Sequence, residues 1–175
     1  MATQSEVTSP AATESWASET SRVYGEGVVA GLVGAATVAI WFLILDSLRG
    51  RPFYTPMVLG SALLRGGQGL EAPHTLGVDF EVVFTFTWIH VLAFLVIGAA
   101  AARLVALAEQ DPNFGFGVLL LFVVFEFGFV LVCMLFAEPV LRAVAWPAVL
   151  IGNLLAAAAM AATLWRRHPT LKINP

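Results

Sequence analysis

The chain of 175 residues is 59% hydrophobic and only 12% charged, and its mean hydropathy is +0.85. Soluble domains are about 45–50% apolar and about 25% charged, so this composition indicates an integral membrane protein that contacts a lipid bilayer. A net charge of −3 without a dense basic patch argues against nucleic acid as a partner. The one cysteine, Cys133, lies in an apolar run, which excludes a disulfide framework within the chain and a thiolate metal site.

Residues 1–23 are expected to form a polar N-terminal tail. Residues 1–21 are rich in Ser, Thr and Ala and contain three Glu but no Lys or Arg. Such a segment buries too little apolar surface to offset its ordering entropy, so we expect it to be disordered on its own. It lacks the apolar core of a signal peptide, which predicts that it is retained.

Four apolar runs follow, each long enough to cross a hydrocarbon core of about 30 Å at about 1.5 Å per residue. They predict a transmembrane domain over 24–168 and a C-terminal tail over 169–175. The predicted fold class is all-α, an integral membrane four-helix bundle. Its spans are expected at about 27–48, 82–107, 114–137 and 144–165.

A short apolar segment after the first span, Met57 to Leu64, cannot cross a membrane. Thr55 before Pro56 predicts an N-cap followed by proline at the first helical position. With Phe53 and Arg65 on its flanks, this helix is expected to lie in the interface or to dip into the membrane as a re-entrant element.

An even number of spans places both termini on the same side. Lys and Arg are nearly balanced between the two sides, but Arg166 and Arg167 directly follow the last span, which favours the cytoplasm for both termini.

Polar side chains inside the spans are the candidate functional residues, since ionisable groups cost about 2.5–3.5 kcal/mol at the centre of a bilayer. Glu126 and Asn153 lie near the middle of the third and fourth spans, and His90 lies in the second. The three side chains can meet inside a bundle as a polar intramembrane cluster. One interpretation is a proton relay or ion site, and the other is hydrogen bonding between helices.

His90 also shares one helix face with Phe94, Gly98 and Ala102. This face is expected to pack against another helix. The alternative is that His90 is the axial ligand of a five-coordinate porphyrin or chlorin, with Gly98 leaving room for the macrocycle. No cofactor is otherwise predicted. Asp46, one turn before the end of the first span, is expected to pair with Arg49 at i+3.

Small residues in the first span recur at the i, i+4 spacing that lets two membrane helices approach closely. Gly27 and Gly31 form one such pair, and Ala30 and Gly34 form another. These residues, with Gly98 and Ala102 of the second span, are the expected helix-packing residues. The other interpretation is that they are glycines that a membrane helix merely tolerates.

Three stretches resemble a group of small uncharacterised bacterial four-span integral membrane proteins. They are GLVGAATVAIWFLILDSLRGRPFYTPMVLGSALL, HVLAFLVIGAAAARL and AVLIGNLLAAAAMAATLWRRHPTL. The resemblance covers most of the chain from about residue 27 onward. It implies four helices and a place in the bacterial inner membrane, and it implies no activity.

The sequence contains no phosphate-binding glycine loop and no His-Glu-x-x-His, Gly-x-Ser-x-Gly or Cys-x-x-Cys motif. We therefore expect no enzyme and no bound metal, but an accessory or structural subunit that binds other membrane protein subunits. The alternatives are a small proton, ion or solute transport protein that uses Glu126, Asn153 and His90, and a haem- or chlorin-binding protein.

Overall fold

The computed structural model describes residues 10–111 and 145–167, together with 116–117, 120, 123–124, 127–128 and 131. Within these residues every regular element is a helix. In chain order they are α1 (Pro10–Leu48), α2 (Tyr54–Leu64), the 3-10 helix η1 (Pro73–Thr75), α3 (Phe80–Gln110) and α6 (Trp146–Trp165). The expected third span, 114–137, falls mostly outside the described residues.

Three helices are long and apolar enough to cross a membrane: Ser18–Leu48 within α1, the whole of α3 and the whole of α6. Only 22% of the most apolar part of α3 is buried, and 33% of the corresponding parts of α1 and α6. In a soluble protein so much exposed apolar surface would be unfavourable, whereas lipid tails solvate it well. The described part of the chain is therefore compatible with a membrane protein.

Helix α1 begins at Pro10, well before the expected start of the first span near Gly27. The segment that we expected to be disordered on its own is therefore helical from Pro10 onward. Proline is favourable at the first helical position because the N–H that it lacks has no partner there. Nucleation is the costly step of helix formation, so polar residues that precede a stable membrane helix extend it at little further cost.

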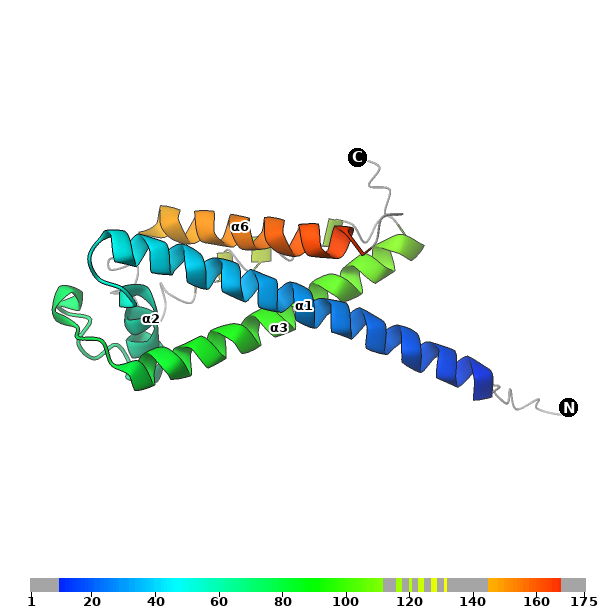
Figure 1. Ribbon diagram of the computed structural model, residues 1–175, viewed down its shortest axis with the longest axis horizontal. Coiled ribbons are helices and arrows are strands. Elements are labelled where there is room, and N and C mark those ends of the chain that lie inside the picture. Colours follow the sequence, from blue (N-terminus) through cyan, green and yellow to red (C-terminus); the bar gives the residue numbers. More distant parts are fainter. Residues whose placement is uncertain are drawn as a thin grey trace, which may run out of the picture.

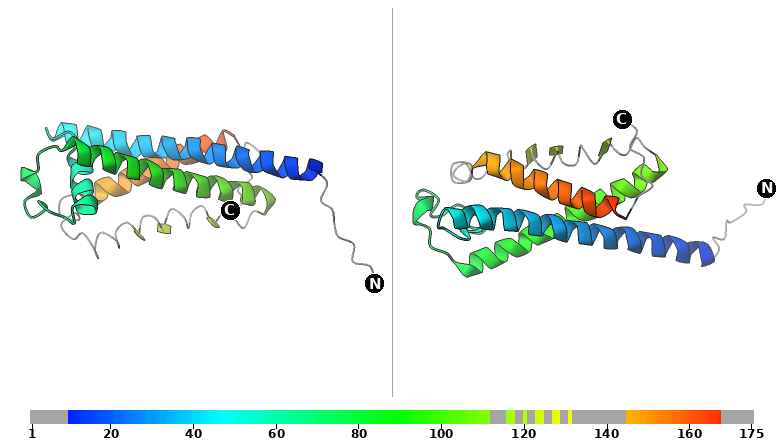
Figure 2. Two further views of the ribbon diagram at one scale, coloured as in Figure 1. Left: turned by 90° about the horizontal axis from the view of Figure 1, so that it is seen from below. Right: turned by 45° about the horizontal axis from the view of Figure 1, so that its top comes forward.

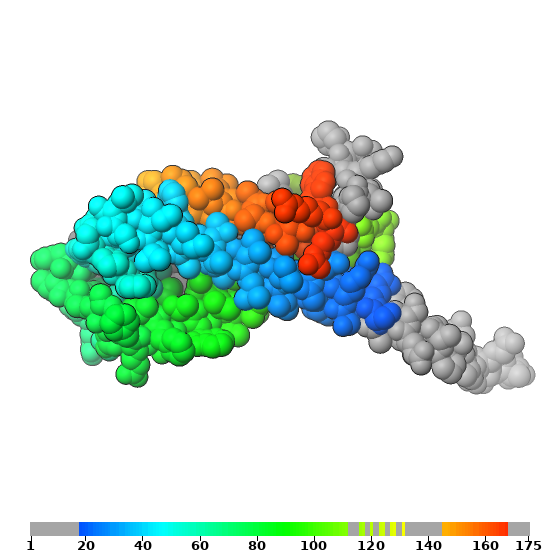
Figure 3. All heavy atoms as spheres, in the orientation of Figure 1, coloured from blue at the N-terminus to red at the C-terminus, as the bar shows by residue number. Residues whose placement is uncertain are grey.

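Helix α1 packs against both α3 and α6. It runs antiparallel to both, crosses α3 as an X and lies along α6, as Figures 1 and 2 show. The Pro10 end of α1 and the Trp165 end of α6 lie at the same end of the bundle. All three helices are open to the surroundings on the face drawn in Figure 3.

Helix α2 lies across the end of the bundle where α1 ends and α3 begins (Figure 1). It buries Met57, Val58 and Gly60, and Val58 joins a core cluster with Val38 of α1 and Val149 of α6. A Cβ on Gly60 would lie 2.6 Å from Cγ1 of Val82, so α2 sits directly on α3. The short helix is thus packed into the end of the bundle. This is also the position in which the sequence predicted an interfacial helix.

Candidate functional site

The crossing of α1 and α3 is built from glycines whose backbones touch. A Cβ on Gly98 would lie 2.2 Å from the carbonyl oxygen of Gly27 and 2.6 Å from the backbone nitrogen of Gly31. A Cβ on Gly31 would lie 2.4 Å from the carbonyl oxygen of Phe94. Because all three obstacles are backbone atoms, no side-chain movement can relieve the contact. Glycine at these positions is what allows the two helices to cross so closely.

Small residues next to the crossing admit side chains from a third helix. Gly34 faces Sδ of Met160 and Cδ1 of Phe94, where its own Cβ would lie within 2.6 and 2.8 Å of them. Ala30 and Ala102 are fully buried in the cluster that contains Met160. The small residues of the first and second spans are therefore used inside the described bundle, between α1, α3 and α6.

His90 connects α3 to α1. Its Nε2 lies 3.2 Å from the carbonyl oxygen of Ala35. A carbonyl can only accept, so Nε2 carries the proton and donates. The ring stacks on Phe86 and tilts against Phe94, with centroids 6.2 and 4.8 Å away. Nε2 is one of the two ring nitrogens that could bind a haem iron. In this arrangement it instead donates to a carbonyl oxygen on another helix.

The expected polar cluster is only partly described, since Glu126 lies outside the described residues. Asn153 lies half-buried on α6 and has polar contacts of its own. Its neighbour Gly152 packs against Trp41, whereas His90 contacts α1 at Ala35. These two positions on α1 are roughly 9 Å apart at about 1.5 Å per residue. His90 and Gly152, the neighbour of Asn153, therefore contact α1 at different levels.

Asp46 makes a contact that the sequence analysis missed. It is 1% exposed, and its carboxylate accepts from the backbone N–H of Thr55 at 2.7 Å and from the Thr55 hydroxyl at 2.9 Å. Within the described part of the chain it forms no ion pair with Arg49, so the expected i+3 pair was wrong. Thr55 outcompetes Arg49 because it is buried beside Asp46 and offers two donors.

The start of α2 explains this contact. The helix begins at Tyr54, so the prediction that Thr55 is its N-cap was wrong. The N-cap is Phe53, which has a left-handed φ of 66° and no side chain that can accept a hydrogen bond. Asp46 supplies the missing acceptor from the end of α1. The signal in the sequence is Phe53 itself: an apolar side chain at an N-cap cannot accept from the first N–H groups of the helix, so another residue has to supply the acceptor.

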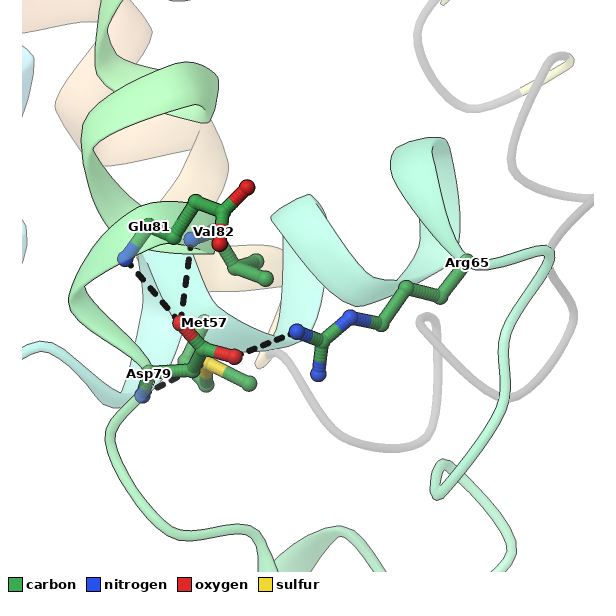
Figure 4. A network of polar contacts seen from close by, with 5 residues as sticks. All are labelled: Met57, Arg65, Asp79, Glu81 and Val82. Atoms are coloured by element: carbon green, nitrogen blue, oxygen red, sulfur yellow. Dashed lines mark hydrogen bonds and ion pairs between the residues drawn. The ribbon is translucent and has the colours of Figure 1, made fainter.

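The connection from α2 to α3 is closed by Arg65 and Asp79, which form an ion pair (Figure 4). Asp79 also caps α3 by accepting from the N–H groups of Glu81 and Val82. The hydrogen bond from Arg65 lowers the pKa of the Asp79 carboxyl below its usual value of 3.8; desolvation opposes this, and the backbone N–H groups reinforce it. One carboxylate thus holds the end of one helix and the start of the next.

The α1–α6 contact has a polar link as well. The indole N–H of Trp41 donates to the carbonyl oxygen of Ala148 at 2.8 Å. That carbonyl lies in the first turn of α6. Sequence reasoning gave no role to Trp41, because a tryptophan in an apolar run carries no signal for its indole partner.

Within the described residues no three His, Cys, Asp or Glu side chains come together as a metal site would require. The three apolar helices, with the close glycine contact between α1 and α3, define the described part of the chain as an all-helical bundle that is compatible with a membrane protein. No family model matches the chain, and no curated protein or solved structure is significantly similar to it.

Proposed function

We propose that this chain is a non-enzymatic multi-pass membrane protein that serves as an accessory or structural subunit of a larger assembly in the bacterial inner membrane. The observation that carries the proposal is the polar N-terminal part of α1. It continues the apolar span as one helix from Pro10, and it projects past the ends of α3 and α6 (Figure 1).

The projecting part is suited to docking against another protein. From Pro10 to Arg22, the residue before Val23 enters the core, it is roughly 18 Å long at about 1.5 Å per residue. Residues 18–22 are exposed, and Tyr24 is 50% exposed. The span that follows nucleates this helix, and a partner that binds its exposed side chains would stabilise it further.

The polar side chains of the described bundle support a structural role. His90, Asp46 and Trp41 each bind a group on another helix: Ala35, Thr55 and Ala148 respectively. Such contacts hold membrane helices together at about 0.6 kcal/mol each on average. A transport path would instead keep its ionisable groups available to a moving ion or proton.

A fourth crossing is part of the proposal. Helices α3 and α6 run in the same direction (Figure 1), so the chain between them has to return to the starting side. The described residues from 116 to 131 are each helical, and Phe116, Leu120 and Phe127 among them are at least half exposed. These observations support a four-span bundle with both termini on one side, for which we favour the cytoplasmic side.

The test is the size of the particle that the protein forms when it is extracted from native membranes in a mild detergent. We expect the full chain to migrate on native gels as part of a larger complex, and deletion of residues 10–21 to release it as a smaller particle with an unchanged melting temperature. A matched control replaces residues 10–21 with an unrelated polar helical sequence of the same length. A full chain that migrates alone, or a control that retains the complex, would overturn docking through this segment.

A further inference from the structure

The corner between α1 and α2 contains a half-open pocket beside the Asp46–Thr55 contact. It has a volume of about 180 Å³ and is lined by Asp46, Arg49, Arg51 and Tyr54. One water needs only about 10–15 Å³ of such space, so the pocket has room for a phosphate-sized group with its bound water. We propose that it binds the phosphate of an anionic phospholipid headgroup.

The charges around the pocket favour an anion. Two arginines line it against one carboxylate, and both oxygens of that carboxylate accept from Thr55. Within the described residues, neither Arg49 nor Arg51 forms an ion pair with an acidic side chain. The pocket therefore offers two guanidinium groups, each with several N–H donors, which pair well with phosphate oxygens.

Arg51 is held in place before any ligand arrives. Its guanidinium carbon lies 3.8 Å from the centroid of the Tyr54 ring, and its Nη2 donates to the carbonyl oxygen of Pro73 at 3.4 Å. This single hydrogen bond uses only one of the five guanidinium N–H donors. A side chain that is already ordered loses less entropy on binding, which strengthens phosphate recognition.

The position of the pocket identifies a lipid as the source of the phosphate. Arg49 and Arg51 come directly after Leu48, the last residue of the candidate span. Leu48 is 79% exposed, as expected for a side chain that reaches the lipid boundary. Arginine and tyrosine at the end of a span lie at the depth of the headgroups, where lipid phosphates are concentrated.

The same geometry predicts selectivity for a lipid with net negative charge. A zwitterionic headgroup such as phosphatidylcholine carries a quaternary ammonium, which favours an aromatic face. The face of Tyr54 is already covered by Arg51, and the excess charge of the pocket repels a cation. Phosphatidylglycerol has the phosphate without the ammonium, so it fits this pocket better.

Native mass spectrometry of the delipidated full chain in detergent tests the proposal, with phosphatidylglycerol and phosphatidylcholine of equal chain length added in turn. We expect one phosphatidylglycerol to bind with preference over phosphatidylcholine. The R49Q/R51Q double variant should bind it on the order of a hundredfold more weakly, since it removes two charge-assisted hydrogen bonds and each corresponds to about one tenfold step.

The matched control is R166Q/R167Q, which removes two exposed arginines at the opposite end of the bundle and should leave this binding unchanged. Because Arg51 also packs on Tyr54, the single variant R49Q, whose side chain is exposed, separates loss of charge from loss of fold; it should weaken binding several-fold at an unchanged melting temperature. Equal binding of the two lipids, or equal effects of the two double variants, would overturn the site. Displacement of the lipid by millimolar inorganic phosphate would overturn the lipid assignment in favour of soluble phosphate.

Discussion

The carboxylate of Asp46 accepts both the backbone N–H and the hydroxyl of Thr55, nine positions along the chain, and so caps helix α2 from the end of helix α1. The contact is fully buried, and it spans a corner that contains Gly50 and Phe53, both with positive φ. One side chain therefore sets both the direction in which the chain leaves α1 and the point at which α2 begins.

This contact predicts a graded loss of stability. Asp46→Ala leaves two buried donors on Thr55 without an acceptor and should lower the free energy of unfolding by about 2–3 kcal/mol. Thr55→Val removes only the hydroxyl and should cost about 1 kcal/mol. Reversible unfolding in detergent micelles measures both, and the double variant should be no worse than Asp46→Ala alone. Full additivity of the two losses would show that the residues do not act together.

The glycine crossing predicts a large effect from one methyl group. Gly98→Ala places a Cβ 2.2 Å from the Gly27 carbonyl oxygen, so α1 and α3 must separate, at a cost of about 1–3 kcal/mol or more. Gly25 is the matched control on α1, because its Cβ would meet nothing within 4 Å. Thermal unfolding in detergent should show a loss for Gly98→Ala and no loss for Gly25→Ala. Equal melting temperatures would mean that the helices do not cross at this point.

His90 is expected to contribute to packing rather than to transport. His90→Phe keeps an aromatic ring between Phe86 and Phe94 but removes the donor to Ala35, so the loss of stability should be about 0.6 kcal/mol. His90→Ala removes the ring as well and should cost several times more. In proteoliposomes, a proton flux that His90→Phe abolished without unfolding the protein would contradict this role and favour the relay interpretation. A visible absorbance band lost in the same variant would favour a bound macrocycle.

The Arg65–Asp79 pair predicts how the α2–α3 connection responds to acid. A carboxyl whose pKa is lowered by folding contributes stability that is present above its unfolded value, near 3.8, and is lost as the pH falls through the lowered folded value. Arg65→Gln should raise the pKa of Asp79 towards 3.8, so the connection opens at a higher pH. Carboxyl-carbon NMR titration of labelled aspartate measures this directly. Arg166→Gln, at the other end of the bundle, should leave the Asp79 titration unchanged.

The direction of the helices predicts which sites are accessible from each side of the membrane. In a background without Cys133, single cysteines at the exposed positions Thr20 and Arg167 should react with an impermeant reagent from the same side, and a cysteine at Gln68 from the opposite side. Reaction of Thr20 and Gln68 from one side would mean that α1 does not cross the membrane.

The sequence by itself determined the helical class and the approximate places of the three candidate spans. Runs of apolar residues about 20 long have few alternatives to a membrane helix, because every backbone polar group must find a partner within its own segment. The i, i+4 pattern of small residues pointed to Gly27, Gly31 and Gly98 as packing residues, and these are the residues at the crossing. The pattern is readable because it is local to one helix.

Only the tertiary structure decided what the polar side chains bind. Asp46 takes Thr55 rather than Arg49, and His90 takes the Ala35 carbonyl, because burial between particular helices selects partners that sequence spacing does not display. The helical N-terminal part of α1 also depends on context. Its polar residues have little helical stability of their own, and the span that they precede nucleates the helix for them. Local patterns report what one helix can do, whereas partner choice depends on which faces meet, and that is a property of the assembled bundle.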